Sequence, residues 1–113
     1  MQEEFEEIYG QAVYESLSIL GQHIASIIIL YVNEKHSIRL SETYDNPKAL
    51  TEALKSTLDG GTRIIQRRIL RLLYYKLGIE PQFAITINFE EKVIKAKEEF
   101  EKKNGKSTRK PIQ

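Results

Sequence analysis

Apolar residues recur at helical spacing from Ile8 to Val32 and continue onto a second face of the same predicted helix. The first stripe comprises Leu17, Leu20, Ile24, Ile27 and Tyr31. A second set, roughly 80–140° away around the helix, comprises Ala25, Ile29 and Val32. Because a surface helix usually buries one face, we expect the first stripe to enter the core. The second set predicts a dimer interface.

The length of this segment supports the same expectation. An unbroken helix from about Glu3 to Asn33 would be about 45 Å long, more than the ~30 Å span of a small domain. Part of it would then overhang or pack on another chain, which predicts a homodimer. The 113 residues suffice for one domain, and we assign 1–105 to a single helical domain and 106–113 to a basic disordered tail.

Composition excludes several classes of protein. The formal net charge is +1, so bulk charge favours neither a generic nucleic-acid-binding protein nor an acidic one. The chain has no cysteine, hence no disulfide, thiol nucleophile or cysteine-ligated metal, and we expect no cofactor. The apolar run from Ile24 to Val32 is about half of the ~20 residues that cross a bilayer, and the amino end is acidic. These features predict a cytoplasmic protein without a membrane partner.

A second and a third helix are predicted after a polar link at 38–45. Asn46 is a candidate cap and Pro47 is suited to the first helical position. The second helix would end at the pair Gly60 and Gly61, where a glycine would adopt the left-handed conformation. With Thr62 as the next cap, the two helices form a predicted hairpin.

The third predicted helix has an apolar side and an arginine side. It runs from about Arg63 to Leu77, and Gly78 with Ile79 is typical of a glycine C-cap. Its apolar side comprises Ile65, Ile69, Leu72, Leu73 and Leu77. Its arginine side comprises Arg63, Arg67 and Arg71, at i, i+4 and i+8.

The pattern changes before the last helix. Apolar and polar residues alternate from Phe83 to Phe89, which indicates a short extended segment. Asn88 and Glu91 have the spacing of a capping box, and a fourth helix follows with an apolar face that includes Val93 and Ala96. The predicted fold is therefore all-α, a small bundle of about four helices with a long first helix and a helical hairpin.

Candidate chemistry is sparse. His23 and His36 are the two histidines, and neither has the spacing of a metal-binding or catalytic pair, so no catalytic or metal-binding residue is predicted. The pair Gly60 and Gly61, close to Arg63, would accommodate an anion at a helix start, but it lacks the Lys-Ser/Thr of a phosphate-binding loop. A structural turn is the preferred interpretation.

The arginine side is the best polar signal. Arg63, Arg67 and Arg71 are candidate contacts with nucleic acid or an anion, in a helix-turn-helix arrangement with the segment 83–89 as a wing. A solvated helix face is the preferred interpretation, because the net charge is near zero and the helix must bury its apolar side.

The order of these elements resembles a known family. The resemblance rests on Leu20-Gly21, Asn46-Pro47, Ala53-Leu54, Gly60-Gly61 and the run Leu72-Leu73-Tyr74-Tyr75-Lys76-Leu77-Gly78. Together they resemble the archaeal Nitrosopumilus output domain 5 family of small helical signalling domains, over about 12–78. The resemblance implies a protein-protein signalling role and supplies no catalytic residues.

Two function classes follow. The preferred one is a non-enzymatic protein-interaction or signalling-output module that acts through helix-mediated homodimer and partner contacts. The alternative is a small nucleic-acid-binding regulator that uses the arginine side and the basic tail.

Overall fold

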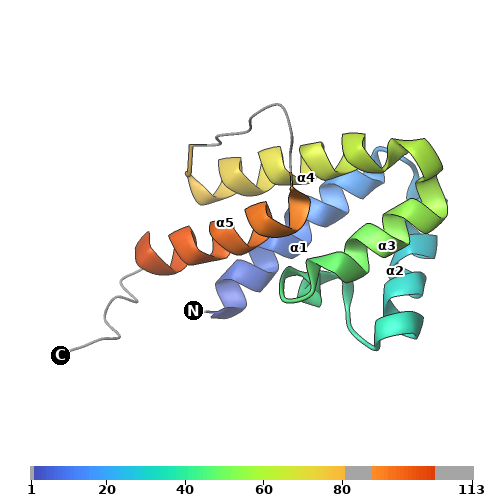
Figure 1. Ribbon diagram of the computed structural model, residues 1–113, viewed down its shortest axis with the longest axis horizontal. Helices are drawn as coiled ribbons and strands as arrows, with labels where there is room; N and C mark the ends of the chain where they lie inside the picture. Colours follow the sequence, from blue (N-terminus) through green and yellow to red (C-terminus); the bar gives the residue numbers. More distant parts are fainter. Residues whose placement is uncertain (1, 81–87, 104–113) are drawn as a thin grey trace.

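Helices make up nearly all of the described chain. The structure is a computed structural model that describes residues 2–80 and 88–103 (Figure 1). Its elements are α1 (Gln2–Ser18), α2 (Gln22–His36), the 3-10 helix η1 (Leu40–Tyr44), α3 (Pro47–Leu58), the 3-10 helix η2 (Asp59–Gly61), α4 (Thr62–Leu77) and α5 (Phe89–Lys103). No strand occurs in these ranges, which confirms the all-α class. The predictions for residues 83–87 and 106–113 lie outside the described residues.

A glycine breaks the predicted long helix, so the prediction of one helix over 3–33 is wrong. Gly21 has φ 98°, a conformation that L side chains rarely adopt. Just before it, the N–H of Leu20 donates to the carbonyl of Leu17 at 2.9 Å, and the N–H of Gly21 donates to that of Ser18 at 3.1 Å. These i to i+3 bonds close the last turn of α1. The 17 residues of α1 span only about 26 Å, so the overhang argument no longer applies.

The break also exchanges the roles of the two apolar faces on α2. The buried residues of α2 are Ala25, Ile28 and Val32. Two of the three residues predicted at a dimer interface, Ala25 and Val32, therefore lie in the core of the same chain, and Ile29 packs partly against that core. Ile27 and Leu30 are exposed instead. The interface prediction assumed a straight helix, whereas the break at residue 21 turns a different face of α2 toward the core.

The η2 turn joins α3 to α4 where the sequence predicts it, but with different local conformations. Asp59 has the positive φ, 60°, whereas Gly61 has φ −86°, so the prediction of a left-handed glycine is wrong. Thr62 is the first residue of α4, and its hydroxyl donates to the carbonyl of Asp59 at 3.3 Å. Pro47 opens α3 as predicted, while the Asn46 side chain makes no capping bond.

The other helix ends follow the sequence signals. Gly78 has φ 71°, and the N–H of Ile79 donates back to the carbonyl of Tyr74 at 3.0 Å, which closes α4 as a glycine C-cap. At the start of α5 the N–H of Glu91 donates to the side-chain oxygen of Asn88 at 2.9 Å. Both predicted caps are confirmed.

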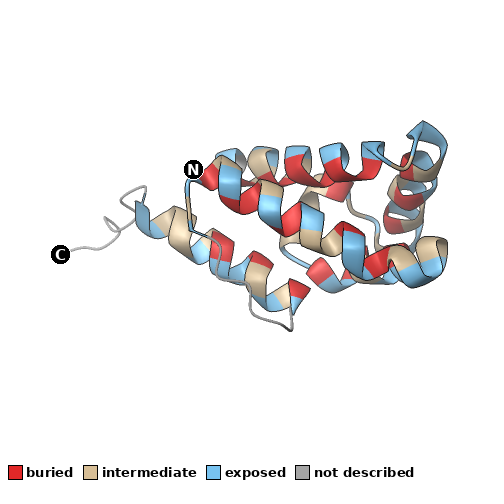
Figure 2. Ribbon diagram, turned by 90° about the horizontal axis from the view of Figure 1, so that it is seen from above, coloured by how far each residue is buried: buried red, intermediate tan, exposed pale blue. Residues whose placement is uncertain are grey.

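The core is built around α1, with α4 lying along it (Figures 1 and 2). The most buried side chains of α1 are Phe5, Tyr9, Ala12, Val13 and Leu17, each at most 1% exposed. An aromatic cluster extends this core to α5 and η1. The ring centroid of Phe5 lies 5.7 Å from that of Phe100 and 5.5 Å from that of Tyr44. No helix within the described ranges is both long and apolar enough to cross a membrane.

One buried hydroxyl connects α1 to η1. The Thr43 hydroxyl donates to the carbonyl of Leu40 at 2.7 Å, so its single proton is used there. The Tyr9 hydroxyl, 2.7 Å from Thr43 Oγ1, must therefore be the donor of that second bond. Burial raises the pKa of the Tyr9 hydroxyl well above its usual range, since the charged form would lose its solvation. Tyr9 is thus a neutral structural donor.

A close backbone approach also holds η1 against α1. Gly10 lies within α1, and a Cβ at this position would be 2.9 Å from the Cβ of Ser41. Real Cβ atoms essentially never approach so closely. The glycine is therefore required by packing, although alanine is the better helix former.

We expect Gly10→Ala to lower the free energy of unfolding by up to about 2 kcal/mol, because overpacking costs roughly 1–3 kcal/mol and the helix-propensity gain of ~1 kcal/mol offsets only part of it. Denaturant unfolding measures the difference. Gly60→Ala is the matched control, since nothing lies within 4 Å of its added Cβ and the φ of Gly60 is not positive. If Gly10→Ala were as stable as this control, the close packing of α1 on η1 would be contradicted.

Candidate functional site

Helix α4 buries one side and exposes the other. Its buried residues are Thr62, Ile65, Ile69, Leu70, Leu73, Tyr74 and Leu77. The opposite side presents four arginines, of which Arg63, Arg68 and Arg71 are exposed and Arg67 is half-buried. The predicted separation of an apolar and an arginine side is confirmed, except that Leu70 replaces the half-buried Leu72 in the core.

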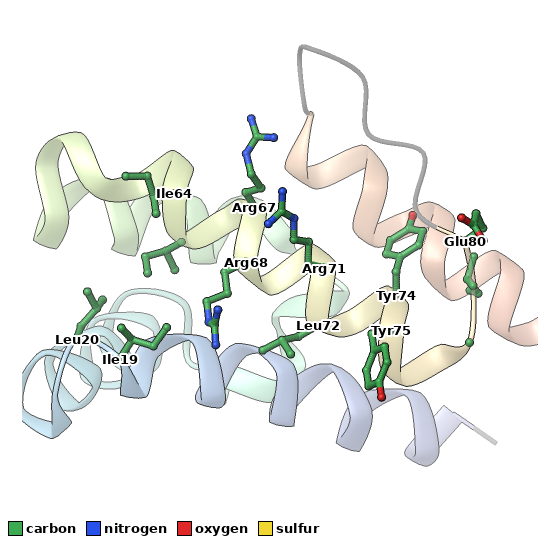
Figure 3. Close-up of a pocket in the computed structure, with 13 residues that line it drawn as sticks. Ile19, Leu20, Ile64, Arg67, Arg68, Arg71, Leu72, Tyr74, Tyr75 and Glu80 are labelled. Carbon is green, nitrogen blue, oxygen red and sulfur yellow. The ribbon is translucent and has the colours of Figure 1, made fainter.

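A groove of about 1250 Å³ runs beside the exposed side of α4, and we call it the α4 groove (Figure 3). It is lined by Ile19 and Leu20 from the turn after α1, by α4 residues Ile64, Ile65, Arg67, Arg68, Arg71, Leu72, Tyr74 and Tyr75, and by Gly78, Ile79 and Glu80. Two stretches that are distant in the sequence, residues 19–20 and 64–80, thus meet at one concave surface. Arg63 is exposed but does not line it.

Large apolar side chains are exposed in the α4 groove. Tyr75 is 83% exposed, Ile64 is 70% exposed and Ile19 is 58% exposed. A single exposed apolar residue is ordinary in a folded protein, but a contiguous patch rimmed by polar groups marks an interaction site. With these three residues exposed, and with Leu20 and Leu72 also in its lining, the groove is more apolar than an ordinary solvated helix face.

The groove arginines, Arg67, Arg68 and Arg71, have no carboxylate within 4.0 Å among the described residues. Two other cations, Arg39 and Lys76, show what pairing looks like in this fold. Arg39 Nη2 lies 3.4 Å from Glu6 Oε2, and Lys76 Nζ, also on α4, lies 3.2 Å from Glu15 Oε2. The positive charge of the groove is therefore not balanced locally by the described part of the chain.

The groove arginines point in two directions. In Figure 3 Arg68 extends toward α1, while Arg67 and Arg71 extend together to the side away from α1. Leu72 lies beside Arg68, on the side of α4 that faces α1. The one carboxylate that lines the groove, Glu80, lies at the end beyond Tyr74, away from the arginines.

Tyr74 forms part of the groove wall but is itself fixed. Its side chain is 4% exposed, and its hydroxyl donates to the carbonyl of Lys92 on α5 at 2.9 Å. Burial raises the pKa of this hydroxyl, and the negative charge of Glu99 raises it further. Tyr74 therefore stays neutral and attaches α5 to α4.

A second groove runs along α1 and has four carboxylates in its lining. It includes Glu4, Glu6, Glu7 and Glu15. Two of them already have partners, since Glu6 accepts a bond from the Ser41 hydroxyl at 2.8 Å and Glu15 pairs with Lys76. These contacts within the chain give this groove a structural explanation that the α4 groove lacks.

The two histidines do not form a site. His23 is exposed at the start of α2, and His36 Nε2 lies 3.1 Å from Glu52 Oε1 of α3. Across residues 2–80 and 88–103 no three histidine or acidic side chains are grouped so as to hold a metal ion. The glycine pair of η2 forms the connecting turn, as the preferred interpretation had it.

Sequence reasoning identified the arginine side but missed the groove. Ile64 and Tyr75 are apolar residues at positions on the polar side of α4. Their placement was the sequence signal that could have indicated an exposed apolar surface. Nothing local marked Ile19 and Leu20, because their position depends on the break at Gly21.

Comparisons with protein-family models, with curated proteins and with solved structures gave no match for this chain. The resemblance to the archaeal output-domain family therefore stays a prediction.

We expect the triple variant Arg63→Gln, Arg67→Gln and Arg71→Gln to be as stable as the wild type or slightly more stable. These residues form two i,i+4 pairs of like charge, each of which costs an α-helix roughly 0.2–0.5 kcal/mol, and no ion pair is lost. Thermal and denaturant unfolding check this. Arg39→Gln is the comparison, because it removes contacts with Glu6 and Glu42. If the free energy of unfolding of the triple variant fell by about 2 kcal/mol, the arginines would instead stabilise the fold.

Proposed function

We propose that the chain is a non-enzymatic protein-interaction module and that the α4 groove is its contact surface. The observation that carries this proposal is the combination of exposed Ile19, Ile64 and Tyr75 with unpaired groove arginines on one concave surface. Aromatic and arginine side chains are the types that dominate binding energy at protein interfaces. A signalling-output role, which the family resemblance implies, fits this proposal, because an output module acts by contacting a partner protein.

A nucleic-acid-binding regulator is the second candidate, and the unpaired groove arginines favour it. Most protein–DNA hydrogen bonds, however, go to phosphate and sugar oxygens. Such contacts would engage Arg67, Arg68 and Arg71 but leave Ile64 and Tyr75 uncovered. The apolar part of the groove therefore favours a protein partner over a duplex.

The proposal includes a homodimer, but its contact surface differs from the one that the sequence predicted. Ile27 is 39% exposed and Leu30 is 55% exposed, and their spacing of three residues puts them on one face of α2. We propose this face, in place of Ala25 and Val32, as the contact between two copies.

Light scattering at micromolar concentration tests the dimer. The wild type is expected to have the mass of two chains, and Leu30→Glu to have the mass of one with an unchanged helical circular dichroism spectrum, because a charge in an apolar contact costs several kcal/mol. Tyr75→Glu is the matched control, since it changes the α4 groove and should leave the dimer intact. A monomeric wild type would contradict the proposal.

Site-specific photo-crosslinking tests the interaction module itself. A photoreactive phenylalanine analogue at Tyr75, in cells that naturally express the protein, is expected to give adducts that protease removes and nuclease does not. The same analogue at Tyr14, which is 47% exposed on α1 and outside the α4 groove, is the matched control. The adduct specific to position 75 should disappear when Ile64→Glu is added. Nuclease-sensitive adducts, or equal adducts at both positions, would overturn the proposal.

A further inference from the structure

We infer that the α4 groove binds an amphipathic helix of a partner protein that carries carboxylates on both sides of a narrow apolar stripe. This inference rests on the proposed function and names the chemistry of the partner.

The shape of the exposed apolar surface fits a helix of a few turns. Ile64 and Tyr75 are both exposed on α4 and are separated by about three turns, or about 16 Å along the helix axis. Leu72 lies between them, and Ile19 completes the surface from the turn after α1. An amphipathic helix buries side chains at i, i+3 or i+4 and i+7 in such a groove.

The positions of the arginines specify the charge of that helix. Arg68 extends toward α1, whereas Arg67 and Arg71 extend to the opposite side, so cations lie on both sides of the line that joins Ile64 to Tyr75 (Figure 3). A helix in the groove would place its own flanking residues against these guanidinium groups. Carboxylates there would form charge-assisted bonds, which are about twice as strong as neutral ones. Lysines at the same positions would meet like charge.

Because the groove arginines have no acidic partner in the described part of the chain, they are better suited to bind a ligand than to stabilise the fold. Helix α4 contains five basic residues and no acidic one. Lys76 has a partner in Glu15, but Arg67, Arg68 and Arg71 have no carboxylate within 4.0 Å in the described part of the chain. Like charges at i,i+4 destabilise a helix, so the arrangement costs stability in the free protein. A partner with carboxylates removes that cost when it binds.

The chain itself does not offer a suitable occupant. Residues 81–87 and 104–113 contain no aspartate or glutamate, and the latter segment is basic. In a second copy, the acidic amino end of α1 has its apolar residues Phe5 and Tyr9 buried in its own core. The exposed large apolar residues on the described acidic helices are single ones, Tyr14 on α1 and Ile94 on α5, so neither helix of a second copy presents an apolar stripe among its carboxylates. This favours a different protein as the occupant.

Fluorescence anisotropy with the full chain tests this inference. The probe is a labelled helical peptide of about 15 residues with a leucine stripe at i, i+4, i+7 and i+11 and glutamates on both sides. A second peptide has glutamine in place of every glutamate, and a third has the acidic composition in scrambled order. We expect the acidic peptide to bind at least about tenfold more tightly than either, because charge complementarity and the stripe act together.

Two charge variants locate the binding. Arg67→Gln, Arg68→Gln and Arg71→Gln together should weaken the acidic peptide at least about tenfold and leave the glutamine peptide unchanged. The matched control, Lys48→Gln, Lys55→Gln and Arg63→Gln, removes the same charge from exposed positions outside the groove and should change affinity less than about threefold. Circular dichroism verifies that both variants are folded. Arg67→Glu with Arg71→Glu should in turn favour a peptide with lysines on that side.

The inference fails if the glutamine and acidic peptides bind alike, if the two triple variants behave alike, or if duplex DNA competes with the acidic peptide at equal concentration. In that case the crosslinking at position 75 still decides the proposed function separately: protein adducts there would leave an interaction module with a partner of different chemistry. If neither the selective binding of the acidic peptide nor the protein adducts at position 75 were observed, the proposed interaction module would also be contradicted.

Discussion

The packing of α4 along α1 is the interaction on which both the fold and the candidate site depend. Ile65, Ile69 and Leu73 follow one another at i, i+4 and i+8, and all are buried. With 3.6 residues per turn, burying this row directs Ile64, Arg68 and Tyr75 outward. A rotation of α4 by one residue would bring arginine toward the core, where an unpaired charge is strongly disfavoured. The same constraint that closes the core therefore creates the exposed side of the groove.

Local sequence signals predicted the parts of the fold that local chemistry determines. Proline at the start of α3, Gly78 with Ile79 at the end of α4 and the Asn88 side chain at the start of α5 all act within one turn of helix, and all are found as expected. The positive φ at Asp59 was not predictable in this way. Aspartate adopts a positive φ less readily than the glycines that follow it. The way in which α3 and α4 must be joined therefore decides which residue has the positive φ.

The break at Gly21 shows why the remaining errors occurred together. A glycine inside a helix costs only about 1 kcal/mol relative to alanine, so its presence does not by itself end an apolar helix. Packing against α3 and α1 decides that α2 starts a new direction. Once the break was missed, Ala25 and Val32 were assigned to an interface, and Ile19 and Leu20 could not be placed beside α4. One tertiary feature thus accounts for the wrong interface and for the missed groove.

The arginine row itself was visible in the sequence because its spacing is local, but its meaning required the structure. Helix α5 shows how this chain makes a solvated face: it mixes acidic and basic residues, and Lys97 Nζ lies 3.2 Å from Glu101 Oε2 at i,i+4. Helix α4 has basic residues only, and its exposed apolar side chains lie among them. A face selected for solubility or stability would resemble α5, since opposite charges at this spacing stabilise a helix and like charges destabilise it. This difference in charge between the two helices supports the proposed partner, which would supply the missing negative charge and cover the exposed apolar residues of α4.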